Sequence, residues 1–341
     1  MRSSKILVRK LCYSLTWTYF FAVPWDHSLF FEGLGPISRI ITLITIPFVA
    51  FAVVARGKIR TIKPVHVLMI MFLVLAESTF YWTVDPDTTL TTMRTYVQVM
   101  IAVWFAWEFA ADSESRRKLG VAYMLGCYVS IINTFWEFAT SATTAIKSAQ
   151  RFGAEGWDQN DLAVTLALGI LISRYAAQGA SKPVRMLAFA YLPLALVAIA
   201  LTGSRGGSLV AAVAVLAVVL QWKGRSALAV TAFGILITCA GLSFVPEKTL
   251  DRILTMTSDI QDMNSRVPIW RAAASAVPSH LLLGAGAGTF RTASGTGMVA
   301  HNTFLSVLLE EGLVGLGLFL SMIAMLFRSV RQAPPQLDRY G

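Results

Sequence analysis

The chain has 341 residues, of which 55% are hydrophobic and only 14% are charged, and its net charge is +10. A soluble protein of this length would carry about a quarter charged residues, so the composition excludes an ordinary soluble protein. The positive charge is divided among short loops between apolar stretches, which argues against a basic surface for nucleic acid.

Apolar runs of about 17 to 22 residues recur along the chain, and each is long enough to cross the hydrocarbon core as a helix. In chain order we expect spans at 11–25, 38–55, 65–84, 91–110, 119–140, 161–177, 186–203, 207–222, 227–245 and 303–327. The pattern predicts an all-α, polytopic helical membrane protein with about ten transmembrane helices, folded as a single membrane domain over residues 1–341.

The loops on one side of the predicted membrane are rich in Lys and Arg, with the stretches "MRSSKILVRK", "RGKIRTIK", "ESRRK", "SKPVR", "WKGR" and "FRSVRQ". Cytoplasmic loops carry such an excess, so both termini are expected in the cytoplasm. The surplus charge then reports topology and some attraction to anionic membrane lipid, and nucleic acid is not an expected partner. The three cysteines, Cys12, Cys127 and Cys239, lie in predicted spans at unrelated spacings, so we expect packing residues and no disulfide framework.

The longest predicted outer loop, residues 246–299, joins the last two spans. It contains "NSRVPIWRAAASAV", which as a helix would place Val267, Trp270 and Ala274 on one face in the membrane interface, with Arg266 and Arg271 at its edge. Arginine's planar fork suits phosphate oxygens. The two arginines therefore indicate either a substrate phosphate site or an anchor to lipid headgroups.

A second outward arginine, Arg205, stands in "LTGSRGGSLV", a tight turn between two predicted spans. An outward arginine in so short a hairpin runs against the usual charge bias, which favours a functional role over snorkelling to headgroups. The stretch "LLLGAGAGTFR" lacks the GxGxxG spacing and the strand–helix context of a dinucleotide loop. We expect it to be a flexible approach to the next span.

Acidic residues in the outer loops allow two interpretations. Asp85 and Asp87 in "VDPDTT" could hold a metal, or Asp85 and its neighbours could form a turn that caps a helix. The stretch with Asp158, Asn160 and Asp161 likewise resembles the cap of the sixth span.

The last predicted span begins with "AHNTFLSVLLEEGLVGLGLFL". His301 and Asn302 stand at its outer mouth, with Glu310 and Glu311 further along the helix. The glycines that follow, at 312, 315 and 317, are expected to let helices pack closely.

Together these stretches resemble the bacterial O-antigen ligase and polysaccharide polymerase superfamily, which includes exopolysaccharide polymerases. The resemblance rests on "TGSRGG", on "SRVPIWRAAASAVPSHLLLGAGAGTF" and on the His-Asn segment, in that order, and "WDQNDLAVTLAL" is similar to a softer family pattern. Family members commonly continue with further spans after the His-Asn helix, whereas this chain ends soon after "FRSVRQAPPQLDRYG".

The resemblance implies a glycosyltransferase of the bacterial inner membrane that works at the periplasmic face without metal or cofactor. An undecaprenyl-diphosphate-linked glycan would be the donor, and a repeat unit or a lipid A core sugar the acceptor, with inversion at the anomeric carbon. By position, Arg205 and Arg266 would hold the diphosphate, His301 would take the acceptor's proton, and the further substrate-binding residues would be Arg271, Trp270, Asn302 and Glu310.

Three alternatives stay open. A transporter or flippase for an anionic lipid-linked glycan would line a path with the arginines, although the cationic residues are expected only outside the bilayer. A metal-dependent enzyme would use Asp85 and Asp87. A non-catalytic partner in a polysaccharide assembly machine would need no complete site. Ligase and polymerase activities differ in the acceptor, which the sequence does not identify.

Overall fold

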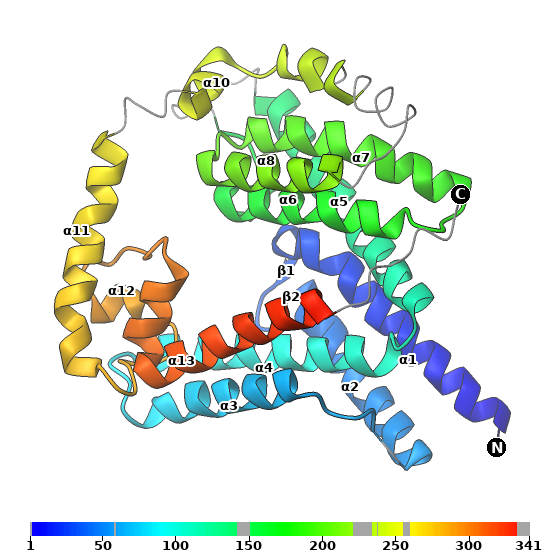
Figure 1. Ribbon diagram of the computed structural model, residues 1–341, viewed down its shortest axis with the longest axis horizontal. Coiled ribbons are helices and arrows are strands. Elements are labelled where there is room, and N and C mark those ends of the chain that lie inside the picture. Colours follow the sequence, from blue (N-terminus) through cyan, green and yellow to red (C-terminus); the bar gives the residue numbers. More distant parts are fainter. Residues whose placement is uncertain are drawn as a thin grey trace. The chain divides into compact units, whose positions relative to one another are not determined.

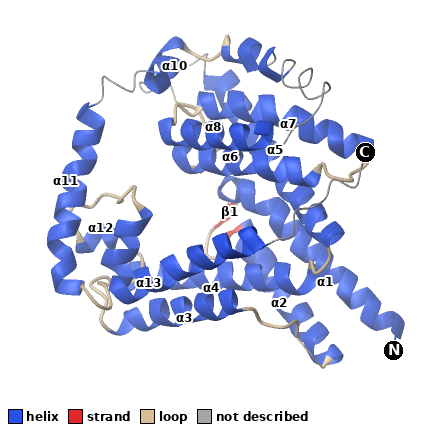
Figure 2. Ribbon diagram, viewed as in Figure 1, coloured by secondary structure: helices blue, strands red, loops and turns tan. Residues whose placement is uncertain are grey.

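The computed structural model describes residues 2–57, 59–141, 151–220, 234–236, 238–254 and 260–332. Nearly all of this part is helical (Figure 2). Its strands, β1 (Phe30–Phe31) and β2 (Gly35–Pro36), form one short antiparallel hairpin in which Phe30 pairs with Pro36. Together with the apolar helices described next, this makes the chain an all-α integral membrane protein, as its composition predicts.

Within the described ranges, five helices are long and apolar enough to cross a membrane. They cover Ile37–Ala55, Pro64–Tyr81, Ser113–Thr140, Lys182–Leu201 and Thr303–Gln332, and a shorter apolar helix covers Arg205–Leu220. Large apolar side chains such as Phe51 and Val54 are exposed on these helices, as expected of surfaces that face lipid. The predicted span 227–245 lies partly outside the described residues, so the total of about ten spans stays a prediction.

The residue contacts divide the chain into two compact units. Unit 1 consists of Met1–Ile59 and Trp104–Met256, and unit 2 of Arg60–Val103 and Thr257–Gly341.

Unit 1 is a helical bundle with a small antiparallel hairpin (Figure 1). Its helices are α1 (Arg2–Ala22), η1 (Val23–Ser28), α2 (Ile37–Arg56), the end of α4 (Pro86–Phe109), α5 (Ser113–Ser141), α6 (Gln159–Ala176), α7 (Lys182–Leu201), α8 (Arg205–Leu220) and α10 (Glu247–Leu254). The core lies among α5 to α8, where Leu166 and Tyr191 are fully buried. Gly207 of α8 packs against Ala163 of α6 with no room for a Cβ, and small residues of this kind let membrane helices approach closely.

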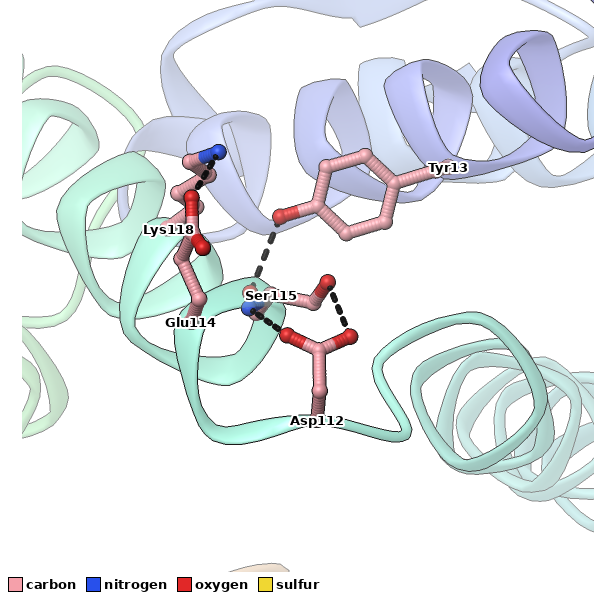
Figure 3. A network of polar contacts seen from close by, with 5 residues as sticks. All are labelled: Tyr13, Asp112, Glu114, Ser115 and Lys118. Atoms are coloured by element: carbon pink, nitrogen blue, oxygen red, sulfur yellow. Dashed lines mark hydrogen bonds and ion pairs between the residues drawn. The ribbon is translucent and has the colours of Figure 1, made fainter.

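A polar network joins α1 to the start of α5 (Figure 3). Asp112 caps α5 by accepting hydrogen bonds from the backbone N–H of Ser115, at 2.8 Å, and from its hydroxyl, at 2.7 Å. The hydroxyl of Tyr13 donates to the Ser115 carbonyl at 2.9 Å, and Lys118 pairs with Glu114 one turn away at 2.7 Å. Three of its residues, Glu114, Ser115 and Lys118, lie in the predicted cytoplasmic loop "ESRRK", so the network ties that loop to α1.

Unit 2 is also helical. It contains α3 (Pro64–Ser78), η2 (Thr79–Tyr81), the first part of α4, α11 (Ile260–Ala276), η3 (Val277–His280), α12 (Phe290–Ala293) and α13 (Thr303–Gln332). Helix α13 packs along α3, while α11 and α12 lie against the first turns of α13 (Figure 1). A small core holds α11, α12 and α13 together. Its buried residues include Ile269, Ala273, Phe290 and Leu309.

The cysteines differ in burial. Cys12 and Cys127 are fully buried, as predicted, and all three thiols are free. The prediction was wrong for Cys239, which is exposed. An apolar residue in a membrane helix can face lipid as readily as the protein interior, and the sequence pattern does not distinguish the two.

Candidate active site

Arg205 is the first residue of α8 and the last residue of a turn, residues 202–205, which we call the Arg205 turn. The predicted tight connection is present, because α7 ends at Leu201. Ser204 caps α8 by accepting the backbone N–H of Gly207 at 3.1 Å. Gly203 has φ of 59°, a left-handed conformation that favours glycine. These features fix where the Arg205 side chain leaves the backbone.

Two residues outside the predicted site hold the Arg205 turn. The Nε of Arg151 donates to the carbonyl of Thr202 at 2.8 Å, and its Nη2 donates to Oδ1 of Asn160 at 3.1 Å. The same Oδ1 accepts the hydroxyl of Ser204 at 2.9 Å. The sequence suggested Asn160 only as part of a helix cap, and that cap is Asp158, which accepts the N–H groups of the first turn of α6. In the sequence, Arg151 shortly before the Asp158 cap was the residue that could have indicated these contacts.

The predicted helix that carries Arg266, Trp270 and Arg271 is present as α11. Its buried face is formed by other residues than the expected interface stripe. Ile269 and Ala273 are buried with Trp270 packed beside them, whereas Ala274 is exposed. Trp270 packs within unit 2, and the position of Val267, Trp270 and Ala274 in the membrane interface stays a prediction. The side chains of Arg266 and Arg271 are exposed.

Trp270 also connects α11 to the start of α13. Its indole N–H donates to the carbonyl of Ala300 at 2.8 Å, and Ala300 is buried directly before His301. His301 has φ of 48°, the left-handed region, and its side chain is exposed. Asn302 caps α13, because its Oδ1 accepts the N–H of Leu305 at 3.2 Å. The predicted His-Asn mouth is thus a fixed bend at residues 300–302 that is hydrogen-bonded to α11. We call this bend the His-Asn corner and α11 the arginine helix.

The stretch "GAGAGTF", residues 284–290, is a tight structure that we call the Gly-rich turn. The expectation of a flexible approach was wrong, because backbone hydrogen bonds fix this segment from several sides. The N–H of Ala285 donates to the Leu309 carbonyl at 2.8 Å, and the N–H of Gly286 to the Glu310 carbonyl at 3.0 Å. The Ala287 N–H donates to the Thr79 hydroxyl at 3.0 Å. Hydrogen bonds to residues far away in the sequence thus hold this irregular segment in place.

The residues just before the Gly-rich turn fit into a break in α13. At Gly312 the helix has φ of 66° and ψ of −167°, a conformation open essentially only to glycine. The N–H groups of Leu313 and Val314 leave the helical ladder and donate to the carbonyls of Leu281 and Leu282, at 2.8 and 3.2 Å. Gly312 is therefore a helix break. Of the other two glycines predicted to let helices pack, Gly315 lies close to Leu75 of α3.

Glu310 holds the Gly-rich turn from the other side. Its carboxylate is buried and accepts the N–H groups of Gly288 and Phe290, at 3.1 and 3.2 Å. The next residue, Glu311, is fully buried, and neither of its carboxylate oxygens has a hydrogen-bond partner among the described residues. These contacts give Glu310 a supporting position behind the turn, and its predicted contact with substrate stays a prediction.

Asp85 caps α4 and joins it to α12. Its carboxylate accepts the backbone N–H of Thr88 at 3.1 Å, the Thr88 hydroxyl at 2.9 Å and the Thr292 hydroxyl at 2.9 Å. The N–H of Thr88, and then the two hydroxyls, hold the pKa of Asp85 below its ordinary value. The helix-cap interpretation is confirmed. Among the described residues, no group of three or more His, Cys, Asp or Glu side chains is spaced to hold a metal ion.

The predicted site residues fall in both units. Arg205 belongs to unit 1, and Arg266, Trp270, Arg271, His301, Asn302 and Glu310 belong to unit 2. Within unit 2 the structure brings the arginine helix, the Gly-rich turn and the His-Asn corner together. That Arg205 meets them stays a prediction.

The comparisons with known proteins agree with these features. No protein of curated function matches the chain. Residues 190–320 match the profile of the family described as O-antigen ligase, and this range includes the Arg205 turn, α11, the Gly-rich turn and the first part of α13. The matched range covers less than half of the chain, and it supports the resemblance to the O-antigen ligase and polymerase superfamily.

Proposed function

We propose that the protein transfers an undecaprenyl-diphosphate-linked glycan to an acceptor sugar at the periplasmic face of the bacterial inner membrane. The family supports ligase- or polymerase-type activity on a lipid-linked glycan and an acceptor in general. The observation that carries the proposal further is the hydrogen bond between Trp270 and Ala300, because it fixes the arginine helix beside His301 within one unit. A polymerase would use another repeat unit as acceptor, and a ligase a lipid A core sugar.

The reaction needs a base for the acceptor and a positive environment for the leaving group. In the proposed step the acceptor oxygen attacks the anomeric carbon, and the bond from that carbon to the phosphate oxygen breaks with inversion. The imidazole of His301 takes the hydroxyl proton as the new bond forms. Arg205 and Arg266 stabilise the negative charge on the departing diphosphate, with Arg271 as a further cationic neighbour.

The geometry of unit 2 suits such a base. The His301 side chain is exposed at the mouth of α13, where an acceptor sugar can reach it. Its backbone is fixed on both sides, by the Ala300 carbonyl that accepts Trp270 and by the Asn302 cap. Catalytic groups act best when their supporting residues hold them in place before the substrate binds.

The test is glycan transfer in proteoliposomes with undecaprenyl-diphosphate-linked repeats and EDTA present. The native chain is compared with His301→Asn, Arg266→Gln and Arg205→Gln, and Arg185→Gln, an exposed arginine at the start of α7, is the matched control. Transfer by the native chain and the control, with loss in the other three folded variants, supports the proposal.

Other outcomes would overturn it. Equal transfer by native protein and His301→Asn would remove the base from the mechanism. Movement of the lipid-linked glycan across the bilayer without transfer would favour the transporter. Loss of activity that EDTA causes and added divalent metal restores would favour a metal-dependent reaction.

A further inference from the structure

Arg151 has a defined place beside the Arg205 turn. Its guanidinium binds the carbonyl of Thr202 and the amide oxygen of Asn160, at 2.8 and 3.1 Å. Asn160 in turn binds the hydroxyl of Ser204, the residue before Arg205. The guanidinium of Arg151 is therefore bound to the four-residue turn of unit 1 from which Arg205 projects.

The two arginines and the helix end at this turn favour an anion, and the acids nearby oppose it. Arg205 opens α8, and Arg151 is held at the same end of that helix, where the helix dipole is positive. Two cations at a helix N-terminus repel that dipole, and a bound anion reverses the sign of the interaction. Among the nearby acids, Glu137 of α5 accepts the backbone N–H of Gly153 at 2.6 Å, two residues after Arg151, and the carboxylate of Asp158 is engaged in capping α6. Asp161 stands in the same first turn and reduces the net positive charge.

An apolar cleft begins one residue away from this cationic turn. It has a volume of about 230 Å³ and is lined by Phe135 and Phe138 of α5, by Leu194, Val197 and Leu201 of α7, and by Phe244. Leu201 connects the two features. Its carbonyl accepts the N–H of Phe152 at 2.9 Å, and the carbonyl of the next residue accepts Arg151. A cationic turn and an apolar cleft thus share the end of α7.

We propose that Arg151 and Arg205 bind the phosphate groups of a polyprenyl diphosphate, whose first isoprene units enter the cleft of α5 and α7. The inference rests on the proposed function for the identity of the lipid and adds Arg151 and the cleft to the site. A lipid-linked donor has this combination of a charged head and an apolar chain. Bidentate guanidinium groups suit its phosphate oxygens, and an all-apolar lining suits the chain.

Binding of undecaprenyl diphosphate without a glycan tests this subsite separately from transfer. The native protein in nanodiscs is compared with Arg151→Gln, Arg151→Lys and Leu194→Trp. The controls are Arg185→Gln for charge and Val213→Trp for an added indole on an exposed position of α8. Undecaprenyl monophosphate and inorganic diphosphate are measured beside the diphosphate lipid, so that headgroup and chain contributions separate.

We expect Arg151→Gln to weaken binding of undecaprenyl diphosphate roughly 10-fold, because one charge-assisted contact is lost. The preference for diphosphate over monophosphate should fall with it, a change that a purely structural role would not produce. Arg151→Lys should recover part of the affinity. Leu194→Trp should weaken binding of the lipid and leave inorganic diphosphate unaffected.

Affinities within twofold of the controls in both Arg151→Gln and Leu194→Trp would overturn the subsite. If Arg151→Gln does not fold, Arg151→Lys and Leu194→Trp still decide the question. Lipid binding that depends on Arg151 in a protein without glycan transfer would leave the subsite standing and remove the proposed function. Transfer that depends on His301 but not on Arg151 or Leu194 would do the reverse.

Discussion

The indole N–H of Trp270 donates a 2.8 Å hydrogen bond to the carbonyl of Ala300, and so ties α11 to the residue that precedes His301. This single bond joins segments 30 residues apart and fixes the backbone from which the proposed base projects. The contact gives Trp270, which stands between the two arginines of α11, a structural role at the start of α13.

Trp270→Phe keeps an aromatic ring and removes the N–H donor. We expect kcat to fall roughly 10- to 100-fold, because a small displacement of a catalytic group has a large effect on rate. Trp136→Phe, at an exposed tryptophan of α5, is the matched control. Steady-state transfer kinetics check the prediction, and an unchanged kcat in Trp270→Phe would show that this bond does not position the base.

His301→Asn should retain the fold and lose transfer. Asparagine accepts a left-handed backbone readily, and the native φ at this position is 48°. Removing a general base costs about 10²–10⁴ in rate. The measurement pairs transfer kinetics with thermal unfolding in detergent, and His301→Gly separates backbone strain from chemistry, since it should be as inactive as the asparagine variant.

Glu310→Ala should loosen the Gly-rich turn. The backbone N–H groups of Gly288 and Phe290 would lose their acceptor, at about 1–3 kcal/mol for each. Glu310→Gln keeps one acceptor oxygen and should lie between native and alanine. Hydrogen exchange at residues 284–290 reports the change directly. Glu155→Ala, at an exposed glutamate, should leave that exchange unchanged.

Gly312→Ala should destabilise unit 2. The native conformation at this residue excludes a Cβ on backbone grounds, which costs about 1–3 kcal/mol, and the added carbon would meet the Leu282 backbone. Gly317→Ala is the control, because a Cβ added there would meet no atom of the described residues within 4 Å. Unfolding midpoints should fall for Gly312→Ala alone. Equal unfolding midpoints for Gly312→Ala and Gly317→Ala would mean that the stability of unit 2 does not depend on the helix break.

Acid should weaken the cap of α5. The N–H and hydroxyl of Ser115 lower the pKa of Asp112 to about 2. A carboxyl whose pKa is depressed in the folded state contributes stability above its unfolded value, and that contribution disappears as the pH falls through the folded pKa. The difference in Tm between native protein and Asp112→Asn should be complete above pH of about 4 and shrink toward pH 2. A constant difference over that range would contradict the ionised cap.

The sequence determined the class of the protein and the position of its main elements. Apolar runs long enough to span a bilayer act locally, so they predict helices without knowledge of any partner. The tight turn at Arg205 and the helix of Arg266 and Trp270 were predictable for the same reason. Their signals are glycine beside a helix start and helical spacing of apolar residues.

Only the tertiary structure decided what surrounds these elements. Ala287 finds its acceptor in Thr79, which is 208 residues away, and Arg151 finds Thr202 at a separation of 51 residues. Hydrogen bonds of this kind depend on which segments the fold brings together, and the spacing of residues in the sequence does not predict these contacts. The same holds for the helix break at Gly312, where the carbonyls of Leu281 and Leu282 accept the N–H groups that leave the helix. Local sequence thus set the helices, and long-range backbone pairing shaped the ends where the proposed chemistry lies.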